Sequence, residues 1–234
     1  MTLERRSRFG IFLFLMSCLV VGVPAAHADT LVLTDNSGYP VGTWAEGSTH
    51  GNFFVNFVGF GTVSVVQVSS TNKVIELKPA TSTSPSETHA ALVTTLGSWG
   101  DLDTSVKMTT VQQLRTGSTP NYWEVAWFIW HYTDNDHFYY FTLKPNGWEL
   151  GKRDPNYPGG QRFLATGSSP TLTFGATTIV RVRQVGNEIG IYLNNGAQLT
   201  YFPDNETPYT SGNIGYYTED AQVRFDDLNV YTVP

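Results

Sequence analysis

Along most of the chain, apolar and polar residues alternate with a period of two, and Gly, Pro, Asn or Asp residues interrupt the alternation. This pattern is typical of β-strands joined by tight turns, because successive side chains of a strand point to opposite faces. Turn-forming sequences at 133–136, 145–147, 185–187 and 194–196 join neighbouring runs. The pattern predicts strands over 30–34, 53–58, 61–68, 73–78, 90–95, 103–114, 122–132, 137–144, 147–153, 161–166, 178–184, 187–194, 197–202, 211–217 and 221–231.

Helix signals are nearly absent, so the alternation predicts an all-β fold in which two antiparallel sheets pack as a β-sandwich. The segment 178–194 shows the alternation most clearly. Its apolar side chains are expected in the core, namely Val180, Val182, Ile189, Ile191 and Leu193, and its charged ones outside, namely Arg181, Arg183 and Glu188. In the last segment, "AQVRFDDLNVY", the spacing of apolar residues changes between Phe225 and Leu228. This change predicts a β-bulge at Asp226–Asp227.

The first 28 residues read as a secretory signal peptide. They contain a basic start, "MTLERRSR", an apolar stretch of fifteen residues, "FGIFLFLMSCLVVGV", and a small-x-small ending, "PAAHA". We expect cleavage between Ala28 and Asp29, leaving 29–234 as one domain in a secreted or periplasmic protein. A signal this short is typical of bacteria. No later segment has the ~20 apolar residues of a membrane span, so the mature form is expected to be free of the membrane.

The composition of residues 29–234 narrows the possible partners. The only cysteine, Cys18, is lost with the signal, so no disulfide is expected. Removal of Glu4, Arg5, Arg6 and Arg8 leaves 11 basic and 19 acidic side chains, a net charge of −8. An acidic chain without a basic cluster argues against binding to nucleic acid. We expect a monomer.

Four of the six tryptophans lie in one stretch, "YWEVAWFIWHYTDNDHFYYFTLKPNGWELGK", at 122–152. Strand alternation places Val125, Trp127 and Ile129 on one face, and we assign them to the core together with Phe141 and Leu143. The opposite face mixes rings with charges, namely Glu124, Trp130, Tyr132, Tyr140 and Lys144. An unpaired charge is costly to bury, so this face is expected to be a concave surface on which a ligand stacks. The alternative is a second buried layer in which Glu124 and Lys144 are paired.

The order of motifs over roughly 100–232 resembles the concanavalin A-like, laminin-G-like jelly rolls. The motifs are D-x-D, F-Y-Y-F-x-L, N-G-W-E-L, R-V-x-Q-V-G-N-x-I-x-I-Y-L-N and the ending G-N-I-G-Y-Y-T-x-D-A-x-V-R-F-D-D-L-x-V. That superfamily includes sugar-binding modules, glycosidases and polysaccharide lyases. The resemblance implies a single β-jelly-roll domain at 29–234, and it implies function only weakly because such folds carry many activities.

The first hypothesis for function is that the chain binds a polysaccharide or oligosaccharide on the aromatic concave face without cleaving it. The residues expected to bind the ligand are Gln113, Trp130, His131, Tyr132, Tyr140 and Lys152. Rings can stack on the C–H faces of sugars, and polar groups can hold the hydroxyls.

The alternative hypothesis is a polysaccharide-cleaving enzyme that uses the same groove. A glycoside hydrolase needs two carboxylates, and Glu124 and Glu149 flank the groove. A polysaccharide lyase needs groups that neutralise a uronate and a residue that moves a proton. Gln113, Arg115, His131, Tyr140, Lys144 and Lys152 offer such groups. If the chain is an enzyme, the expected catalytic residues are Glu124, Glu149, Arg115, Tyr140 and Lys144.

A structural calcium ion is a further expectation, because related jelly rolls often hold one near the paired terminal strands. Oxygen ligands for it could come from Asp35, Asn36, Asp226 and Asp227 if the first and last strands pair. The alternative is a turn aspartate and a solvated bulge. The histidines of the mature chain show no spacing typical of a zinc site.

Overall fold

The computed structural model describes residues 28–234. The expected signal peptide, 1–28, therefore lies outside the described residues except for Ala28. In the described part of the chain, regular structure consists of strands and one short 3-10 turn, η1 (Pro158–Gly160). The predicted all-β class is confirmed.

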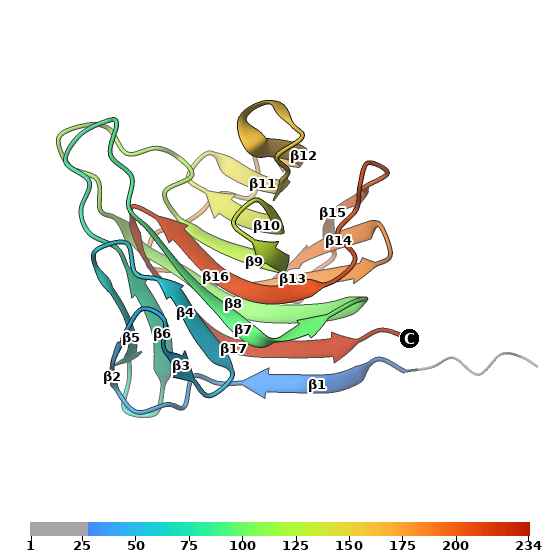
Figure 1. Ribbon diagram of the computed structural model, residues 1–234, viewed down its shortest axis with the longest axis horizontal. Helices are drawn as coiled ribbons and strands as arrows, with labels where there is room; N and C mark the ends of the chain where they lie inside the picture. Colours follow the sequence, from blue (N-terminus) through green and yellow to red (C-terminus); the bar gives the residue numbers. More distant parts are fainter. Residues whose placement is uncertain (1–27) are drawn as a thin grey trace, which may run out of the picture.

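The strands form two antiparallel sheets that pack face to face (Figure 1). Sheet A contains, in spatial order, β15 (Gln198–Pro203), β14 (Glu188–Leu193), β13 (Thr177–Val185), β8 (Leu102–Gln113), β17 (Ala221–Thr232), β6 (Lys73–Lys78), β5 (Thr62–Gln67) and β2 (Gly42–Trp44), with β1 (Thr30–Asp35) paired to β17. Sheet B contains β12 (Gln161–Gly167), β11 (Gly147–Arg153), β10 (His137–Lys144), β9 (Ala126–Asp134), β16 (Gly212–Glu219), β7 (Ala90–Trp99), β4 (Phe53–Phe57) and β3 (Thr49–His50). Figure 1 shows β7 and β16 of sheet B as curved strands.

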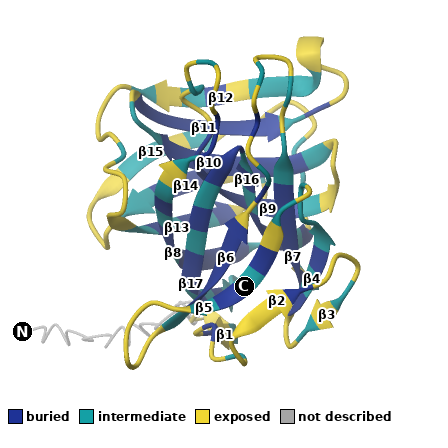
Figure 2. Cartoon of the chain, turned by 90° about the vertical axis from the view of Figure 1, so that its left-hand side faces the viewer, coloured by how far each residue is buried: buried dark blue, intermediate teal, exposed yellow. Residues whose placement is uncertain are grey.

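The main core lies between the two sheets, where alternate side chains of each strand meet. Val180 and Val182 of sheet A are fully buried there, as are Ile189 and Ile191 of the next strand. Arg181 lies on the outer face, as the alternation predicts. In Figure 2 the buried residues follow the middle of the strands, and the exposed residues lie mainly in loops and at strand ends.

The first and last strands pair with each other: β1 runs antiparallel to β17, with Asp35 opposite Leu228. The predicted bulge is confirmed: the pairing of β17 with β8 shifts register between Asp226 and Asn229, and Asp227 has a positive φ of 50°. The bulge explains how Phe225 and Leu228, which are three residues apart, both reach the core.

Every strand that the sequence predicts has a counterpart in the structure. The pattern misses β2 and β3, which have three and two residues and are too short to show alternation. The predicted strand 122–132 also begins too early, because the observed strand β9 begins at Ala126 and residues 122–125 belong to a loop.

Candidate functional site

The outer face of sheet B, away from the main core, carries a second group of buried side chains. Its members are aromatic or aliphatic, namely Leu92, Val125, Trp127, Ile129, Phe138 and Tyr140. The side chains pack against one another, and each is at most 6% exposed. Gly215 of β16 makes room for Ile129, since a Cβ at Gly215 would lie 2.7 Å from Ile129 Cγ1. We call this group the outer layer.

At one end of the outer layer lies a hollow of about 250 Å³, which we call the aromatic hollow. Its lining comes from the 114–125 loop, β9, β11, β12 and β16, namely Trp123, Trp127, Glu149, Gln161, Phe163 and Glu219. Trp123 and Phe163 are 46% and 61% exposed, whereas Trp127 and Glu149 are 5% and 6% exposed. Two rings therefore stand at the rim, and a third ring and a carboxylate lie deeper.

Glu149 is held in place by its neighbours. The Tyr140 hydroxyl donates a hydrogen bond to Glu149 Oε1 at 2.6 Å, and Lys144 Nζ donates to Oε2 at 2.6 Å. Gln161 Nε2 donates to the Tyr140 hydroxyl oxygen at 2.6 Å. Burial raises the pKa of Tyr140 well above its usual range, and the adjacent Glu149 raises it further, so this hydroxyl keeps its proton. Lys144 offsets the charge of Glu149.

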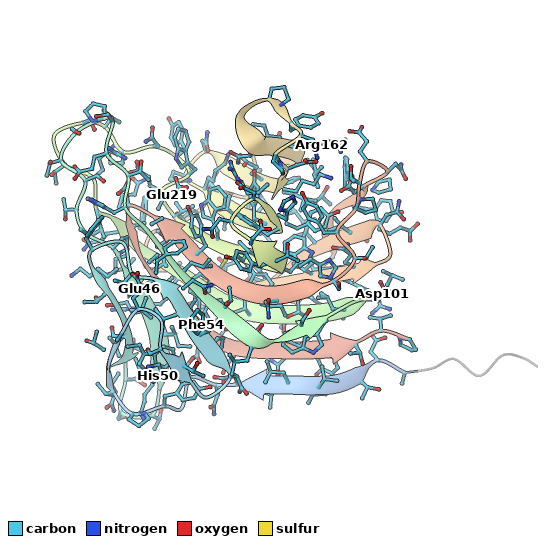
Figure 3. The ribbon with its side chains drawn as sticks, viewed as in Figure 1. Glu46, His50, Phe54, Asp101, Arg162 and Glu219 are labelled. Atoms are coloured by element: carbon cyan, nitrogen blue, oxygen red, sulfur yellow. The ribbon has the colours of Figure 1, made fainter. Side chains whose placement is uncertain are left out.

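Glu219 has a different environment. It lies at the end of β16 (Figure 3) and accepts a hydrogen bond from the Tyr217 hydroxyl at 2.6 Å. Burial raises the pKa of Glu219 and outweighs the hydrogen bond from Tyr217; the nearby carboxylates of Asp220 and Glu124 raise it further. The Tyr217 ring packs edge-on against Trp127, with 5.5 Å between the centroids. The aromatic hollow thus contains one carboxyl group beside a lysine and one whose pKa is raised above its ordinary value.

A buried ion-pair network anchors the loop that carries Trp123. Arg115 Nε donates to Glu124 Oε1 at 2.6 Å, and Arg115 Nη2 donates to Asp220 Oδ2 at 2.6 Å. All three side chains are at most 2% exposed. The same guanidinium donates to the carbonyl oxygens of Ser84 and Glu87, so it also holds the 79–89 loop. We call Arg115, Glu124 and Asp220 the anchor triad.

The anchor triad corrects two predictions for the catalytic residues. Arg115 and Glu124 were expected to contact a substrate in the groove, but both are buried and paired with each other. Lys144 is paired with Glu149, not with Glu124 as in the buried-layer alternative. Glu149, Tyr140 and Lys144 do lie together, so three of the five predicted catalytic residues form one cluster.

β9 faces the opposite way from the sequence prediction. Trp130 points into the main core and is fully buried, and its Nε1 donates to Gln184 Oε1 at 2.7 Å. Val125, Trp127 and Ile129, which were expected in that core, lie in the outer layer. The prediction that Trp130 stacks on a ligand is therefore wrong. Both sets of β9 side chains are apolar, so alternation alone does not tell the two faces apart.

Two more of the residues expected to bind the ligand are fully buried. The ring nitrogens of His131 lie 2.7 Å from the carbonyl oxygen of Tyr209 and 3.0 Å from that of Gly100. Lys152 Nζ pairs with Asp204 Oδ2 at 2.8 Å. Neither side chain reaches the surface, so both predictions are wrong.

Gln113 and Tyr132, which the sequence also predicts to bind the ligand, have structural contacts outside the aromatic hollow. Gln113 Nε2 donates to the carbonyl oxygen of Asn121 at 2.6 Å. Tyr132 packs on Phe138, with 5.9 Å between the ring centroids, and donates to Asn135 Oδ1. Tyr140 is also fully buried, so the prediction that it contacts the ligand is wrong as well; its hydroxyl donates instead to Glu149, which lines the aromatic hollow.

The sequence pattern does not identify most residues that line the aromatic hollow, namely Trp123, Trp127, Gln161, Phe163 and Glu219. The alternation of buried and exposed residues does indicate that two of these side chains, Glu219 and Phe163, point away from the main core. Glu219 alternates with the buried Tyr216 and Thr218, and Phe163 precedes the buried Leu164. The missing information was the pairing of distant strands, which places β16 and β12 on either side of β9–β11.

The residues expected to bind calcium are hydrogen-bonded or paired within the protein. Asp35 accepts hydrogen bonds from Tyr39, Asn52 and the Ser37 backbone. Asp227 pairs with Lys107 at 2.5 Å, and Asp226 accepts from the Asp227 backbone. Among residues 28–234, no three His, Cys, Asp or Glu side chains are grouped so that they could hold a metal ion. Calcium binding stays a prediction without support from a ligand cluster.

The sequence matches no protein-family model and no curated protein. Solved structures of similar fold include the carbohydrate-binding module CBM66 from Bacillus subtilis, with a TM-score of 0.55 and 11% identity over 77% of this chain and 96% of that chain. The mixed-linkage glucan GH16 protein from Bacteroides ovatus has a TM-score of 0.52 and 8% identity over 85% of this chain and 97% of that chain. The chain shares the two-sheet antiparallel β-sandwich (jelly-roll) fold of these structures.

A third similar structure is a GlcNAcα1-4Gal-releasing endo-β-galactosidase from Clostridium perfringens, with a TM-score of 0.53 and 9% identity over 90% of this chain and 65% of that chain. Identities this low show a shared fold and carry no residue-by-residue correspondence. In residues 28–234, no helix has the length and hydropathy of a membrane span.

Proposed function

We propose that the chain is a secreted or periplasmic protein that binds a polysaccharide or oligosaccharide in the aromatic hollow. The observation that carries this proposal is the combination of two exposed rings, Trp123 and Phe163, with a deeper ring and polar groups in one hollow. Exposed rings cost free energy in water, and a sugar that stacks on them would remove their apolar surface from solvent. The structural likeness to a carbohydrate-binding module is consistent with this role.

The polar groups of the aromatic hollow suit the hydroxyls of a sugar. Gln161 offers an amide donor and acceptor, and Glu149 accepts hydrogen bonds. Glu149 is already oriented by Tyr140 and Lys144, so a hydroxyl that binds to it meets an acceptor of fixed geometry. Such preorganisation reduces the ordering cost of binding.

Titration calorimetry on residues 29–234, with a panel of soluble polysaccharides and their oligosaccharides, tests the proposal. Replacement of a rim ring, Trp123→Ala or Phe163→Ala, is expected to weaken binding about 5- to 150-fold, by analogy with the ~1–3 kcal/mol that a nucleic-acid base gains by stacking on one aromatic ring. Tyr201→Ala is the matched control, since Tyr201 is 51% exposed on β15, the edge strand of the other sheet. No binding to any member of the panel, or equal binding by all three variants, would contradict the proposal.

A second candidate function, hydrolysis of a glycosidic bond at the same hollow, is favoured by the two carboxyl groups that line it. Glycoside hydrolysis requires a protonated acid and an ionised partner. The two carboxyl groups differ in environment, because burial raises the pKa of Glu219 and Glu149 lies beside Lys144. A reducing-end assay separates this from binding alone. Hydrolysis predicts product release that both Glu149→Gln and Glu219→Gln abolish, whereas binding alone predicts no product with any variant.

A further inference from the structure

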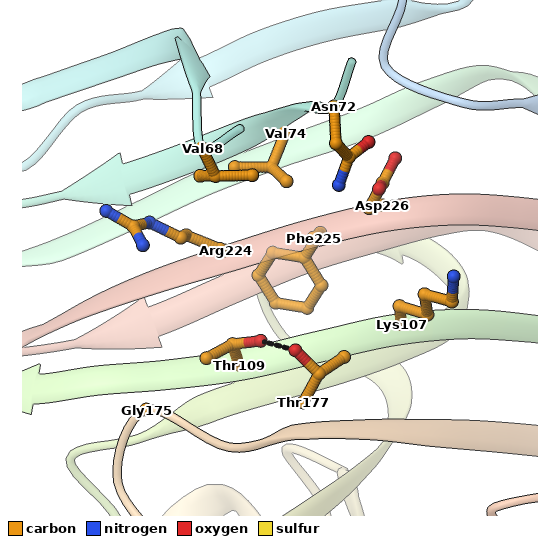
Figure 4. Close-up of a pocket in the computed structure, with 10 residues that line it drawn as sticks. All are labelled: Val68, Asn72, Val74, Lys107, Thr109, Gly175, Thr177, Arg224, Phe225 and Asp226. Atoms are coloured by element: carbon orange, nitrogen blue, oxygen red, sulfur yellow. Dashed lines mark hydrogen bonds between the residues drawn. The ribbon is translucent and has the colours of Figure 1, made fainter. Parts of the chain in front are cut away.

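A second hollow, of about 340 Å³, lies on the outer face of sheet A, and we call it the opposite hollow. Its base is formed by β6, β17, β8 and β13, and its sides by the 68–72 turn and the loop that contains Gly175 (Figure 4). The main core separates it from the aromatic hollow, which lies on the outer face of sheet B. The lining residues are Val68, Asn72, Val74, Lys107, Thr109, Gly175, Thr177, Arg224, Phe225 and Asp226.

The lining combines an apolar centre with hydrogen-bonding groups around it. Val68, which is 41% exposed, lies on one side, and Val74, which is 6% exposed, lies on the base. The ring of Phe225 lies below the base in the main core, where it stacks on Tyr216. Thr109 and Thr177 lie on neighbouring strands across from the valines, and their hydroxyl oxygens are 2.8 Å apart (Figure 4). In such a pair one hydroxyl donates to the other, which leaves one proton and several lone pairs free for a ligand.

The charges around the opposite hollow are already compensated. Lys107 Nζ lies 2.5 Å from Asp227 Oδ2, and Arg224 Nε lies 2.8 Å from Glu76 Oε2. Asp226 adds a further carboxyl group. With two cations and three acidic groups, the site has no excess of positive charge that would attract an anion. A neutral ligand with many hydroxyl groups fits both the paired charges and the free threonine hydroxyls.

We infer that the opposite hollow is a second binding site, which takes a neutral sugar unit independently of the aromatic hollow. An apolar patch bordered by hydroxyl and amide groups matches a pyranose, which has apolar C–H faces and a rim of hydroxyls. The volume lies within the ~300–1,000 Å³ typical of small-molecule sites. Because the two hollows lie on opposite sides of the sandwich, one short oligosaccharide cannot fill both, and a molecule with both sites occupied holds two separate glycan segments.

The test is a backbone-amide NMR titration of residues 29–234 with cellotetraose, maltotetraose, xylotetraose and galactotetraose, and with digalacturonate and inorganic sulfate as anionic probes. We expect at least one neutral tetrasaccharide to shift the amides around Thr109, Gly175 and Thr177 in a saturable manner. The Thr109→Val/Thr177→Val double variant keeps the shape and the β-propensity of both positions but removes both hydroxyls. It is expected to weaken binding at this site about tenfold, the loss of two ligand hydrogen bonds.

Two further variants give the controls. Thr200→Val, on β15 of the same sheet, removes a hydroxyl outside the opposite hollow and is expected to leave both sites unchanged. Thr177→Trp fills the opposite hollow on an exposed strand position and is expected to abolish its shifts while those at the aromatic hollow remain.

The possible outcomes separate this inference from the proposed function. Shifts confined to the aromatic hollow would overturn the second site and leave the first intact, whereas shifts confined to the opposite hollow would do the reverse. Shifts around Thr177 with digalacturonate or sulfate, and with none of the tetrasaccharides, would overturn the assignment to a neutral sugar. Shifts that survive unchanged in the double valine variant would also overturn it, as would the absence of shifts around Thr177 with every probe.

Discussion

Glu219 shows how a single carboxyl group can set the pH dependence of this protein. Its pKa is raised chiefly by burial, with Asp220 and Glu124 adding to the effect. The folded state therefore binds the proton more tightly than the unfolded state does. The contribution of Glu219 to the free energy of unfolding is fully present below its ordinary pKa of 4.5 and is lost as the pH rises through the raised folded value.

This loss of unfolding free energy with rising pH predicts the behaviour of Glu219→Gln, a variant that keeps the shape of the protonated side chain. The variant and the unchanged protein should have similar unfolding free energies below about pH 4.5, and the variant should become the more stable as the pH rises. Urea denaturation at several pH values between 4 and 8 measures the difference. Glu188→Gln, which removes an exposed carboxylate on β14, controls for the change in net charge. A stability difference that does not change with pH would contradict the assignment.

The anchor triad gives a second prediction at the level of residues. Arg115→Met leaves the buried carboxylates of Glu124 and Asp220 without their cation, and loss of one partner of a buried pair costs about 3–5 kcal/mol. Arg224→Met breaks the more exposed pair with Glu76 and should cost only about 0–1 kcal/mol. Chemical denaturation measures both losses. Equal losses in the two variants would show that the triad has no special role.

At the level of elements, β9 explains which part of the site was predictable. Alternation correctly groups Val125, Trp127 and Ile129 on one face, but both faces of this strand are apolar. Polar contacts outside the strand accompany this orientation: Gln184 of β13 accepts from Trp130 in the main core, and Arg115 donates to Glu124 in the preceding loop. Short-range patterns contain no information on such contacts, and for this reason the sequence predicts the strands and the bulge but misplaces most of the ligand-facing residues.

β11 contributes a glycine on which the neighbouring strand depends. The Tyr140 ring of β10 lies against Gly151, and a Cβ at that position would be 2.2 Å from the Tyr140 hydroxyl oxygen and 2.8 Å from the Arg162 carbonyl oxygen. Gly151→Ala must therefore displace Tyr140 and its hydrogen bond to Glu149. We expect a destabilisation of about 1–3 kcal/mol together with weaker sugar binding at the aromatic hollow.

Gly190→Ala is the control for the glycine substitution. Gly190 lies on β14, and the nearest atom to a Cβ there is 3.2 Å away, on the movable Tyr192 side chain. This variant should keep both the stability, to within about 1 kcal/mol, and the binding. Thermal unfolding and titration calorimetry, done on both variants, check the prediction. A Gly151→Ala protein that binds as tightly as the unchanged protein would show that the position of Tyr140 does not matter for the site.

At the level of the whole molecule, the charge distribution selects among glycans. Residues 29–234 carry a net charge of −8, the aromatic hollow contains Glu149 and Glu219, and the cations of the opposite hollow are paired. Both the negative net charge of the chain and the acidic groups at the two hollows therefore disfavour the binding of a polyanionic glycan. Burial of rings against a neutral sugar is, in contrast, almost independent of ionic strength.

The affinity for a neutral oligosaccharide should therefore change less than about twofold between 50 and 500 mM NaCl, since no ion pair forms on binding and salt screens only the interaction of charges. A polyuronate of equal length should bind more weakly at low salt, and any residual binding should strengthen as salt screens the repulsion. Titration calorimetry with a neutral and a uronate oligosaccharide at both salt concentrations measures this. Tight uronate binding that weakens with salt would contradict this prediction, because it would require a cation free to pair with the uronate. The variants Lys144→Met and Arg153→Met would then identify that cation. Lys144 pairs with Glu149, and the charge of Arg153 acts on Glu219, so both lie close to the carboxyl groups of the aromatic hollow.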